Sequence, residues 1–495
     1  MTLISRLMGF ARDIVIANLF GVNGATDAFF VAFRIPNFLR RLFAEGAFAN
    51  AFVPILTRLD NQSDKQSLQA FIDRSAGSLS LVLLFLTLIG VLLAPLLIVL
   101  FAPGFVWQGG QYPLSIEFLQ ITFPYLFFIT LTAFAGSILN AKGRFAVPAL
   151  TPVVLNLALI LAAIYLAPLM AEPVTALAWG VLLAGIVQLA IQIPALLQSG
   201  FLPRPRLGFK DPNVRQMLRS MPSAIFGVSV VQINLLIDTV FASFLPAGSI
   251  SWLYYSDRLV EFPLGLLGGA LAAVILPRLS NHHAINDQAG FSKSMDWGLK
   301  WVLLLGLPAS LGLSLLAEPI IATLFQHQAF SANDTLMASR SLTAFASGLL
   351  GFVMIKILVP GFTARHDTRT PLRFGYYSIF ANLIFNAVLL VPLAHAGPAL
   401  ATSLAAYLNA AALLVVMIKR GIYRPGDGWS LFLLRIFFAN FVMATGLYVW
   451  VEADLWGIWD VAKRSLQLLI SIIGALIVYA VVLLVSGLRP NALKY

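Results

Sequence analysis

Long apolar stretches separated by short polar loops make up almost the whole chain. A helix needs about 20 mostly apolar residues to cross the hydrocarbon core of a membrane, whereas the strands of a membrane barrel would show short alternating segments. The pattern therefore predicts an all-α polytopic membrane protein. We expect fourteen transmembrane helices, over residues 1–20, 26–57, 75–102, 114–140, 147–167, 174–198, 214–245, 249–278, 297–318, 331–361, 371–392, 396–419, 430–451 and 464–487.

The charges of the loops alternate in step with these helices. One set of loops carries many Lys and Arg residues, and it comprises 58–74, 141–146, 199–213, 279–296, 362–370 and 420–429. The other set carries none, and it comprises 21–25, 103–113, 168–173, 246–248, 319–330 and 393–395. Basic loops stay on the cytoplasmic side of a membrane. We therefore expect both termini in the cytoplasm, with Lys463 and Arg464 as the exception on the outer side.

Composition supports a membrane protein and excludes several other classes. The 495 residues are 59% hydrophobic and only 11% charged, and the mean hydropathy is +0.88. The net charge of +11 sits mostly in the basic loops, so it indicates membrane topology and no nucleic-acid partner. The absence of cysteine excludes disulfides and thiolate metal sites. Met1 leads directly into a charged helix, so we expect no signal peptide.

The chain also repeats itself at an offset of 223 residues. The matched pairs are Pro54 with Pro277, Lys142 with Arg365, Pro148 with Pro371, and Ala176 with Ala399. Six helices per unit is an even number, so both units enter the membrane from the same side and form a parallel repeat. Repeated halves with a site between them are typical of transporters. We expect an N-lobe at 1–200, a C-lobe at 201–424, and two additional helices at 425–495.

The second predicted helix carries charges at membrane depth. At 100° per residue, Asp27, Arg34, Arg41 and Glu45 fall within about 40° of one another. Ionisable groups inside a membrane are expensive and usually face a bundle interior or a water-filled cavity. The stripe therefore indicates a functional site. The alternative is that these charges pair internally and only hold helices together.

Two further predicted helices carry charged groups. The first contains Arg6, Arg12 and Asp13, and the eighth contains Asp257, Arg258 and Glu261. Arg258 and Glu261 have the spacing of an ion pair on one helix face. In the first two helices arginine outnumbers acidic residues, which favours an anionic ligand, and the planar guanidinium suits phosphate. A lattice of salt bridges completed by water is the alternative.

The chain shows no Walker motif, nucleophile elbow or zinc signature. We therefore expect a transporter that is not an enzyme, with no catalytic residue, cofactor or metal ligand. His282 and His283 fall in a predicted polar loop, where a solvated role is favoured over metal binding. Three other classes remain open: an exporter of cationic drugs, an enzyme acting on polyprenyl phosphates, and a scaffold. The surplus of arginine argues against the exporter of cationic drugs, which would carry surplus carboxylates. The absence of acidic clusters argues against the enzyme, and the internal repeat argues against the scaffold.

Three segments carry a resemblance to one protein family, and the resemblance extends over nearly the whole chain. They are SRLMGFARD from Ser5, ATDAFFVAFRIPNFLRRLFAEGAFANAFVPIL from Ala25, and WLYYSDRLVEFPLGLLGGALAAVILP from Trp252. They resemble the MurJ (MviN) family of lipid II flippases, in the multidrug/oligosaccharidyl-lipid/polysaccharide exporter superfamily. The resemblance implies two six-helix lobes in a V-shaped bundle plus two C-terminal helices. It also implies a central cavity for the head group and a groove by the last two helices for the polyprenyl tail.

The resemblance also implies roles for individual residues. Matched by position, the substrate-binding arginines would be Arg6, Arg12, Arg40 and Arg258, although the helical wheel favours Arg41 over Arg40. Gating or charge-pairing residues would be Asp13, Asp27, Glu45, Asp257 and Glu261. The implied substrate is lipid II, an undecaprenyl-diphosphate-linked disaccharide pentapeptide, in the bacterial cytoplasmic (inner) membrane. We expect a monomer among membrane lipids, with cell-wall synthesis proteins as candidate partners.

Overall fold

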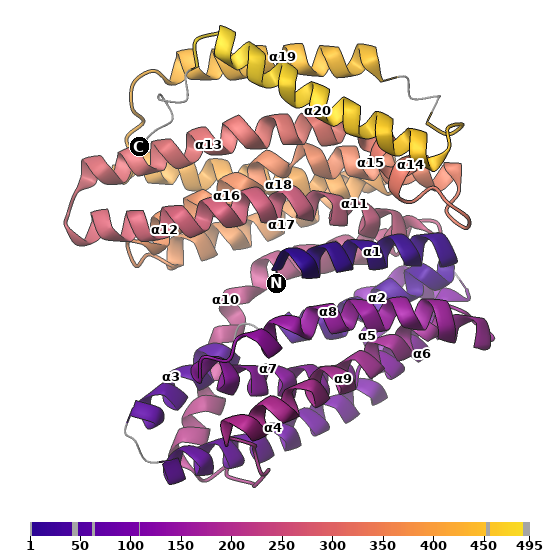
Figure 1. Cartoon of the computed structure of the whole chain (residues 1–495), viewed down its shortest axis with the longest axis vertical. Helices are drawn as coiled ribbons and strands as arrows, with labels where there is room; N and C mark the ends of the chain where they lie inside the picture. Colours follow the sequence, from indigo (N-terminus) through magenta and orange to yellow (C-terminus); the bar gives the residue numbers. More distant parts are fainter. Residues whose placement is uncertain (1, 42–47, 62–64, 108, 452–455, 489–495) are drawn as a thin grey trace. The chain divides into compact units, whose positions relative to one another are not determined.

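The computed structural model describes residues 2–41, 48–61, 65–107, 109–451 and 456–488, and every regular element in these ranges is helical (Figure 1). Eleven helical segments of the described chain are long and apolar enough to cross a membrane. The protein is therefore an all-helical, multi-pass membrane protein. The chain divides into two compact units, residues 1–251 and 252–495.

The first unit contains ten α-helices and the beginning of an eleventh. They are α1 (Thr2–Phe20), α2 (Gly24–Arg40), α3 (Phe48–Asn61), α4 (Lys65–Leu92), α5 (Ala94–Phe101), α6 (Gln111–Thr122), α7 (Tyr125–Ala141), α8 (Ala146–Leu161), α9 (Thr175–Ser199), α10 (Pro212–Ala242) and α11 (Ser249–Pro263). Short turns η2 (Pro103–Val106), η3 (Ala162–Leu166) and η4 (Ala167–Leu169) extend α5 and α8.

The second unit begins within α11 and contains the remaining helices. They are η5 (Leu264–Gly268), α12 (Gly269–Ala284), α13 (Gln288–Leu315), α14 (Ala317–Leu324), α15 (Ala332–Ser347), α16 (Leu349–Thr363), α17 (Arg369–Leu393), α18 (Ala396–Lys419), α19 (Trp429–Trp450) and α20 (Val461–Val485).

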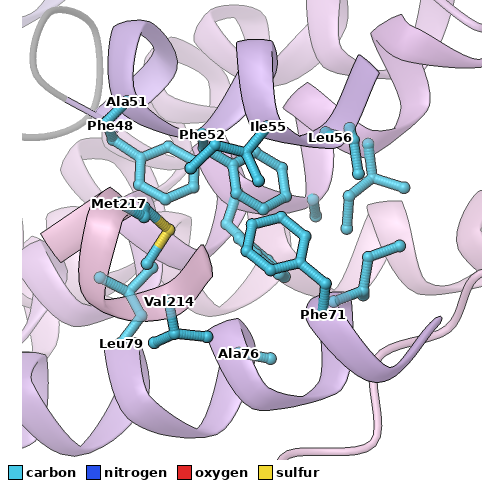
Figure 2. Packing of buried hydrophobic residues seen from close by; sticks show 14 of the residues in the cluster. Phe48, Ala51, Phe52, Ile55, Leu56, Phe71, Ala76, Leu79, Val214 and Met217 are labelled. Atoms are coloured by element: carbon cyan, nitrogen blue, oxygen red, sulfur yellow. The ribbon is translucent and has the colours of Figure 1, made fainter. Parts of the chain in front are cut away.

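An aromatic cluster packs α3 against other helices of the first unit (Figure 2). Phe52 of α3 stacks on Phe71 of α4 at 5.4 Å between ring centroids and lies 5.0 Å from Phe134 of α7. Met217 of α10 joins the same buried cluster. Offset and tilted ring pairs add about 0.5–1.5 kcal/mol each beyond burial alone. The cluster thereby holds α3, α4, α7 and α10 together.

Small residues let the helices of the second unit approach closely. A Cβ atom on Gly348 would lie 2.4 Å from Oγ of Ser403, and one on Gly351 would lie 3.1 Å from the backbone nitrogen of Tyr407. Membrane helices associate by close packing of such residues, because lipid gives no hydrophobic drive between them. α16 therefore lies directly against α18.

The last two helices pack onto the rest of the second unit. α19 contacts α13, and α20 contacts α14. In the C-terminal half of α20, the Tyr479 hydroxyl donates a 2.8 Å hydrogen bond to the carbonyl oxygen of Leu304 in α13. This bond satisfies a buried hydroxyl and fixes α20 along the face of α13.

Several predicted loops are helical in the structure. The predicted loop 58–74 is occupied by the end of α3 and the start of α4, the loop 279–296 by α12 and α13, and part of the loop 319–330 by α14. His282 and His283 consequently lie in the last turn of α12. Asp287 caps the N-terminus of α13, its side chain accepting a bond from the backbone N–H of Gly290. Polar residues thus extend helices beyond their apolar parts.

Two predicted spans are interrupted near prolines. The helix predicted at 75–102 breaks between α4 and α5, just before Pro95, and the one at 114–140 breaks at Phe123 and Pro124. Proline removes a backbone hydrogen bond and clashes with the preceding turn. The helix predicted at 26–57 appears as α2 and α3, and residues 42–47 lie outside the described residues.

Candidate functional site

The charged residues of α1 form a buried pair. Arg12 donates to Oδ1 of Asp13 from Nε at 2.9 Å and from Nη2 at 2.6 Å, and Nη1 donates to Oδ1 of Asn156 in α8 at 3.1 Å. Arg12 and Asp13 are 4% and 2% exposed, whereas Arg6 is exposed. A buried charge persists only when it is paired and hydrogen-bonded. Asn156 also donates to the carbonyl oxygen of Ser5, so it joins α8 to α1 at two points.

Asp27 organises the N-terminal end of α2. Asn23 and Thr26 form a reciprocal capping box that starts the helix there. The Asp27 carboxylate, which is 1% exposed, accepts bonds from the backbone N–H of Gly248 at 2.6 Å and of Ser251 at 2.8 Å, and from the Ser251 hydroxyl at 2.6 Å. Asp27 thereby holds the start of α11 to the start of α2 within the first unit.

The arginines further along α2 are engaged in other contacts. Arg34 donates from Nη1 to the Thr239 hydroxyl and, at 3.3 Å, to the carbonyl oxygen of Leu235, both in α10. Arg40 donates from Nε to Oδ1 of Asn37, one turn earlier in the same helix, at 2.9 Å. Arg34 therefore links two helices of the first unit. Glu45, predicted on the same stripe, lies outside the described residues.

In the second unit the predicted pair on α11 is confirmed. Nη1 of Arg258 donates to Oε2 of Glu261 at 2.8 Å, and the guanidinium lies 5.2 Å from the ring centroid of Tyr254. The side chains of Arg258 and Glu261 are 28% and 38% exposed, so part of the guanidinium surface is accessible. Asp257 is half-buried beside them in sequence.

An apolar groove lies between α19 and α20, with a volume of about 300 Å³. Its walls are Met443, Gly446, Leu447, Trp450, Ile470, Ser471, Gly474, Ala475 and Val478. Apart from the indole N–H of Trp450, the one polar side-chain group in this set is the Ser471 hydroxyl, which donates to the carbonyl oxygen of Gln467 in its own helix. The groove therefore presents an apolar surface suited to a hydrocarbon chain.

The partners of these charges were missed by the sequence patterns. Asn156, Gly248 and Ser251 lie more than 140 positions from the charges that they bind. Asn156 does carry a signal, because an amide within an apolar helix must find a partner. Ser251 carries none, since a serine can satisfy itself within its own helix. Among the described residues no group of three His, Cys, Asp or Glu side chains could hold a metal ion.

Comparison with known proteins agrees with this architecture. A family model described as "Lipid II flippase MurJ" matches residues 16–470. The chain is 46% identical to a "Probable lipid II flippase MurJ" from Vibrio cholerae, covering 100% of this chain and 96% of that protein. It is 41% identical to the "Lipid II flippase MurJ" of Burkholderia cenocepacia, covering 91% and 88% of the two proteins.

Solved structures show the same fold. A structure titled "Lipid II flippase MurJ, inward closed conformation" matches with a TM-score of 0.81 and 27% identity, over 97% of this chain and 96% of that one. An inward-facing multidrug transporter of the MATE family matches with a TM-score of 0.68 and 14% identity, over 84% and 94% of the two chains. At that identity the second likeness concerns the fold alone.

Charged residues buried in a multi-pass helical protein are typical of membrane transporters, and the fold is shared with transporters. The class is therefore a membrane transport protein. Within that class, the chain belongs to the lipid II flippase MurJ family, which is a family of transporters and not of enzymes.

Proposed function

We propose that the chain moves lipid II from the cytoplasmic to the periplasmic leaflet of the bacterial inner membrane by alternating access. The observation that carries this proposal is the family match over residues 16–470, together with relatives named as lipid II flippases. Lipid II joins a charged diphosphate head to a long polyprenyl tail. A protein that moves it needs cationic groups for the head and an apolar surface for the tail.

Arginines are proposed to bind the diphosphate. Arg6, Arg12 and Arg40 come from the first repeat and Arg258 from the second. The accessible guanidinium surface of Arg258 supports a ligand role, because arginine can bind phosphate oxygens with two parallel hydrogen bonds. Arg12 is already paired with Asp13, so its role requires the ligand to compete for the guanidinium.

Acidic residues are proposed to control the arginines and the ends of helices. Glu261 and Asp13 neutralise Arg258 and Arg12 while no diphosphate is bound. Asp27 is proposed as a gating residue, which is supported by its bonds to the start of α11. Asp257 and Glu45 complete the proposed set. A ligand that displaces such pairs favours one conformation over another only through its differential affinity.

The groove between α19 and α20 is proposed to hold the polyprenyl tail. Its apolar lining and its place on the two helices outside the repeat support this assignment. The proposed lobes are 1–200 and 201–424, with the tail-binding helices at 425–495. With the tail kept in the groove, only the head group has to cross the protein.

The positions of the repeated residues support a parallel repeat. Pro148 and Pro371 both lie in the first turns of their helices, α8 and α17. Ala176 and Ala399 are both fully buried near the starts of α9 and α18. The proposal further places both termini in the cytoplasm and the working protein as a monomer.

The second candidate is an exporter of drugs or other lipid-linked oligosaccharides within the same superfamily, favoured by the MATE-like fold. Depletion of the protein in living cells distinguishes the two. Lipid II flipping predicts that undecaprenyl-linked disaccharide pentapeptide accumulates and that growth stops for lack of cell wall. Accumulation of a different lipid-linked sugar, or only an increased sensitivity to drugs, would contradict it.

A further inference from the structure

The connector between α9 and α10, residues 200–211, is fixed along α4 by its backbone. The backbone N–H of Arg204 donates to Oδ1 of Asp73 at 2.8 Å, and that of Arg206 donates to the Asp73 carbonyl oxygen at 3.0 Å. The N–H of Gly208 donates to Oγ of Ser78 at 3.0 Å. Buried Asp73 and Ser78 thus hold an extended, non-helical segment in one conformation.

Two glycines show how closely the connector lies on α4. A Cβ atom on Gly77 of α4 would lie 2.3 Å from the carbonyl oxygen of Arg206. One on Gly208 would lie 2.4 Å from Cβ of Arg74. Neither position accepts a larger residue without movement, so the main chain of the connector rests directly on the helix.

The outward side chains of this connector are basic and apolar. Arg204, Arg206 and Lys210 are exposed, and within the described part of the chain the structure records no ion pair or side-chain hydrogen bond for any of them. Between them, Leu207 is 66% exposed and Phe209 is 43% exposed. The connector therefore displays three uncompensated charges and two apolar side chains on a rigid backbone.

Two basic residues in other connections are compensated by ion pairs. Lys142 pairs with Asp60 at 2.6 Å, and Arg420 pairs with Asp367 at 3.2 Å. The acid that belongs to the connector itself, Asp211, is paired with Arg74. Asp211 and Asp73 are thus occupied in fixing the fold, which leaves the charge of the connector for an outside partner.

The position of the connector identifies the kind of partner. It begins directly after Ser199, the end of an apolar segment long enough to cross a membrane, so it lies at the membrane surface. Basic side chains beside a membrane attract anionic lipids, and neighbouring apolar side chains enter the interface. We propose that the connector 200–211 is a preformed docking surface for anionic phospholipid head groups, with Leu207 and Phe209 inserted among the acyl chains.

A direct test is the affinity of the full-length protein in detergent for phosphatidylglycerol and for phosphatidylcholine, measured by native mass spectrometry. The triple variant Arg204→Gln/Arg206→Gln/Lys210→Gln removes only the outward charges. At roughly fivefold per basic side chain near an anionic surface, its apparent Kd for phosphatidylglycerol should rise on the order of 100-fold. Its Kd for phosphatidylcholine should not change. Leu207→Ser/Phe209→Ser should weaken the binding of both lipids.

The matched control is Arg369→Gln/Lys419→Gln/Arg424→Gln, which removes the same charge from exposed positions of the second unit. It should leave the affinity for phosphatidylglycerol nearly unchanged. The thermal midpoints of both triple variants without added lipid should match that of the parent. An equal loss in the control, or an unchanged affinity in the connector variant, would overturn the proposal. So would soluble polyphosphate that binds the parent connector as tightly as phosphatidylglycerol does.

Discussion

Asp27 accepts two hydrogen bonds from Ser251, one from its backbone and one from its hydroxyl, across 224 positions of sequence. A third bond comes from the backbone N–H of Gly248. Because the carboxylate is almost completely buried, no water molecule can replace it as the acceptor of these hydrogen bonds.

Removing this carboxylate should destabilise the first unit. Asp27→Ala leaves two buried backbone N–H groups unsatisfied, at a cost of about 1–3 kcal/mol each in the free energy of unfolding. Ser251→Ala removes one hydroxyl bond and should cost only about 1 kcal/mol. Thermal unfolding in detergent measures both. Ser115→Ala is the control, since its hydroxyl bonds only within α6. If Asp27→Ala behaves like this control, the carboxylate is not what holds α11.

Membrane topology can be tested with single cysteines, since the chain has none of its own. Asn61→Cys and Arg204→Cys fall in predicted cytoplasmic loops, and Gln326→Cys falls in a predicted outer loop. An impermeant thiol reagent added outside intact cells should label only the last. Labelling of all three positions from outside would contradict the predicted orientation.

Filling the groove between α19 and α20 should weaken binding of the polyprenyl tail. Neither Gly446 nor Gly474 has an atom within 4 Å of an added Cβ, so Gly446→Leu and Gly474→Leu should fold normally. Displacing two methylene groups of the tail, at about 0.8 kcal/mol each, weakens binding on the order of tenfold. A short-chain analogue should lose less affinity. Gly312→Leu, at an equally open position on α13, is the control. Unchanged long-chain binding by both groove variants would exclude this site for the tail.

Asp211 should make stability depend on pH. Partial burial alone would raise the pKa of Asp211, but hydrogen bonds from Arg74 and from the N–H groups of Asn213 and Val214 hold it below 3.8. A folded pKa below the unfolded one gives stability that is complete above pH 3.8 and is lost as the pH falls through the folded value. Thermal midpoints measured below pH 3.8 should therefore fall less steeply in Asp211→Asn than in the parent.

The control for this pH effect is Asp427→Asn, at an exposed carboxyl for which the described structure records no hydrogen bond. The thermal midpoint of this variant should equal that of the parent at every pH. An Asp211→Asn variant with the same slope as the parent would show that Arg74 and the cap do not stabilise the charged carboxylate.

The approximate positions of the membrane-spanning helices could be predicted because a span is recognised from the hydropathy of its own residues. The same rule failed at residues 65–74 and 288–296, where polar side chains such as Asp73 and Asp296 are used to bind neighbouring segments. Hydropathy treats such residues as the end of a span. Their hydrogen bonds to connectors that are distant in sequence allow the helix to continue.

In the candidate site, only the contacts between residues close in sequence could be predicted. Arg258 and Glu261 lie three positions apart, so their pairing follows from helical geometry. The helical wheel placed Arg34 on the charged stripe but could not identify Thr239 as its partner. Pairs such as Arg12 with Asn156 depend on how helices pack, which periodicity in one helix does not specify.

The proposed binding of diphosphate by arginine rests most clearly on Arg258, whose guanidinium is partly accessible beside Glu261. A charge-assisted hydrogen bond contributes about 1.5–3 kcal/mol, so loss of the guanidinium should weaken head-group binding by a factor of roughly 10–150. Arg258→Lys should rescue poorly, because an ammonium cannot form the bidentate contact. Arg34→Ala is the comparison, since the bonds of Arg34 to α10 indicate a structural role.

The decisive measurement is growth of cells that depend on this protein alone for lipid II transport, with its abundance in the membrane determined in parallel. We expect Arg258→Ala and Arg12→Ala each to abolish growth at normal abundance, Arg258→Lys to restore little, and Arg34→Ala to have a milder effect. Full growth of Arg258→Ala or Arg12→Ala at normal abundance would show that these charges only pair with their neighbours, and binding of the diphosphate by arginine would have to be abandoned.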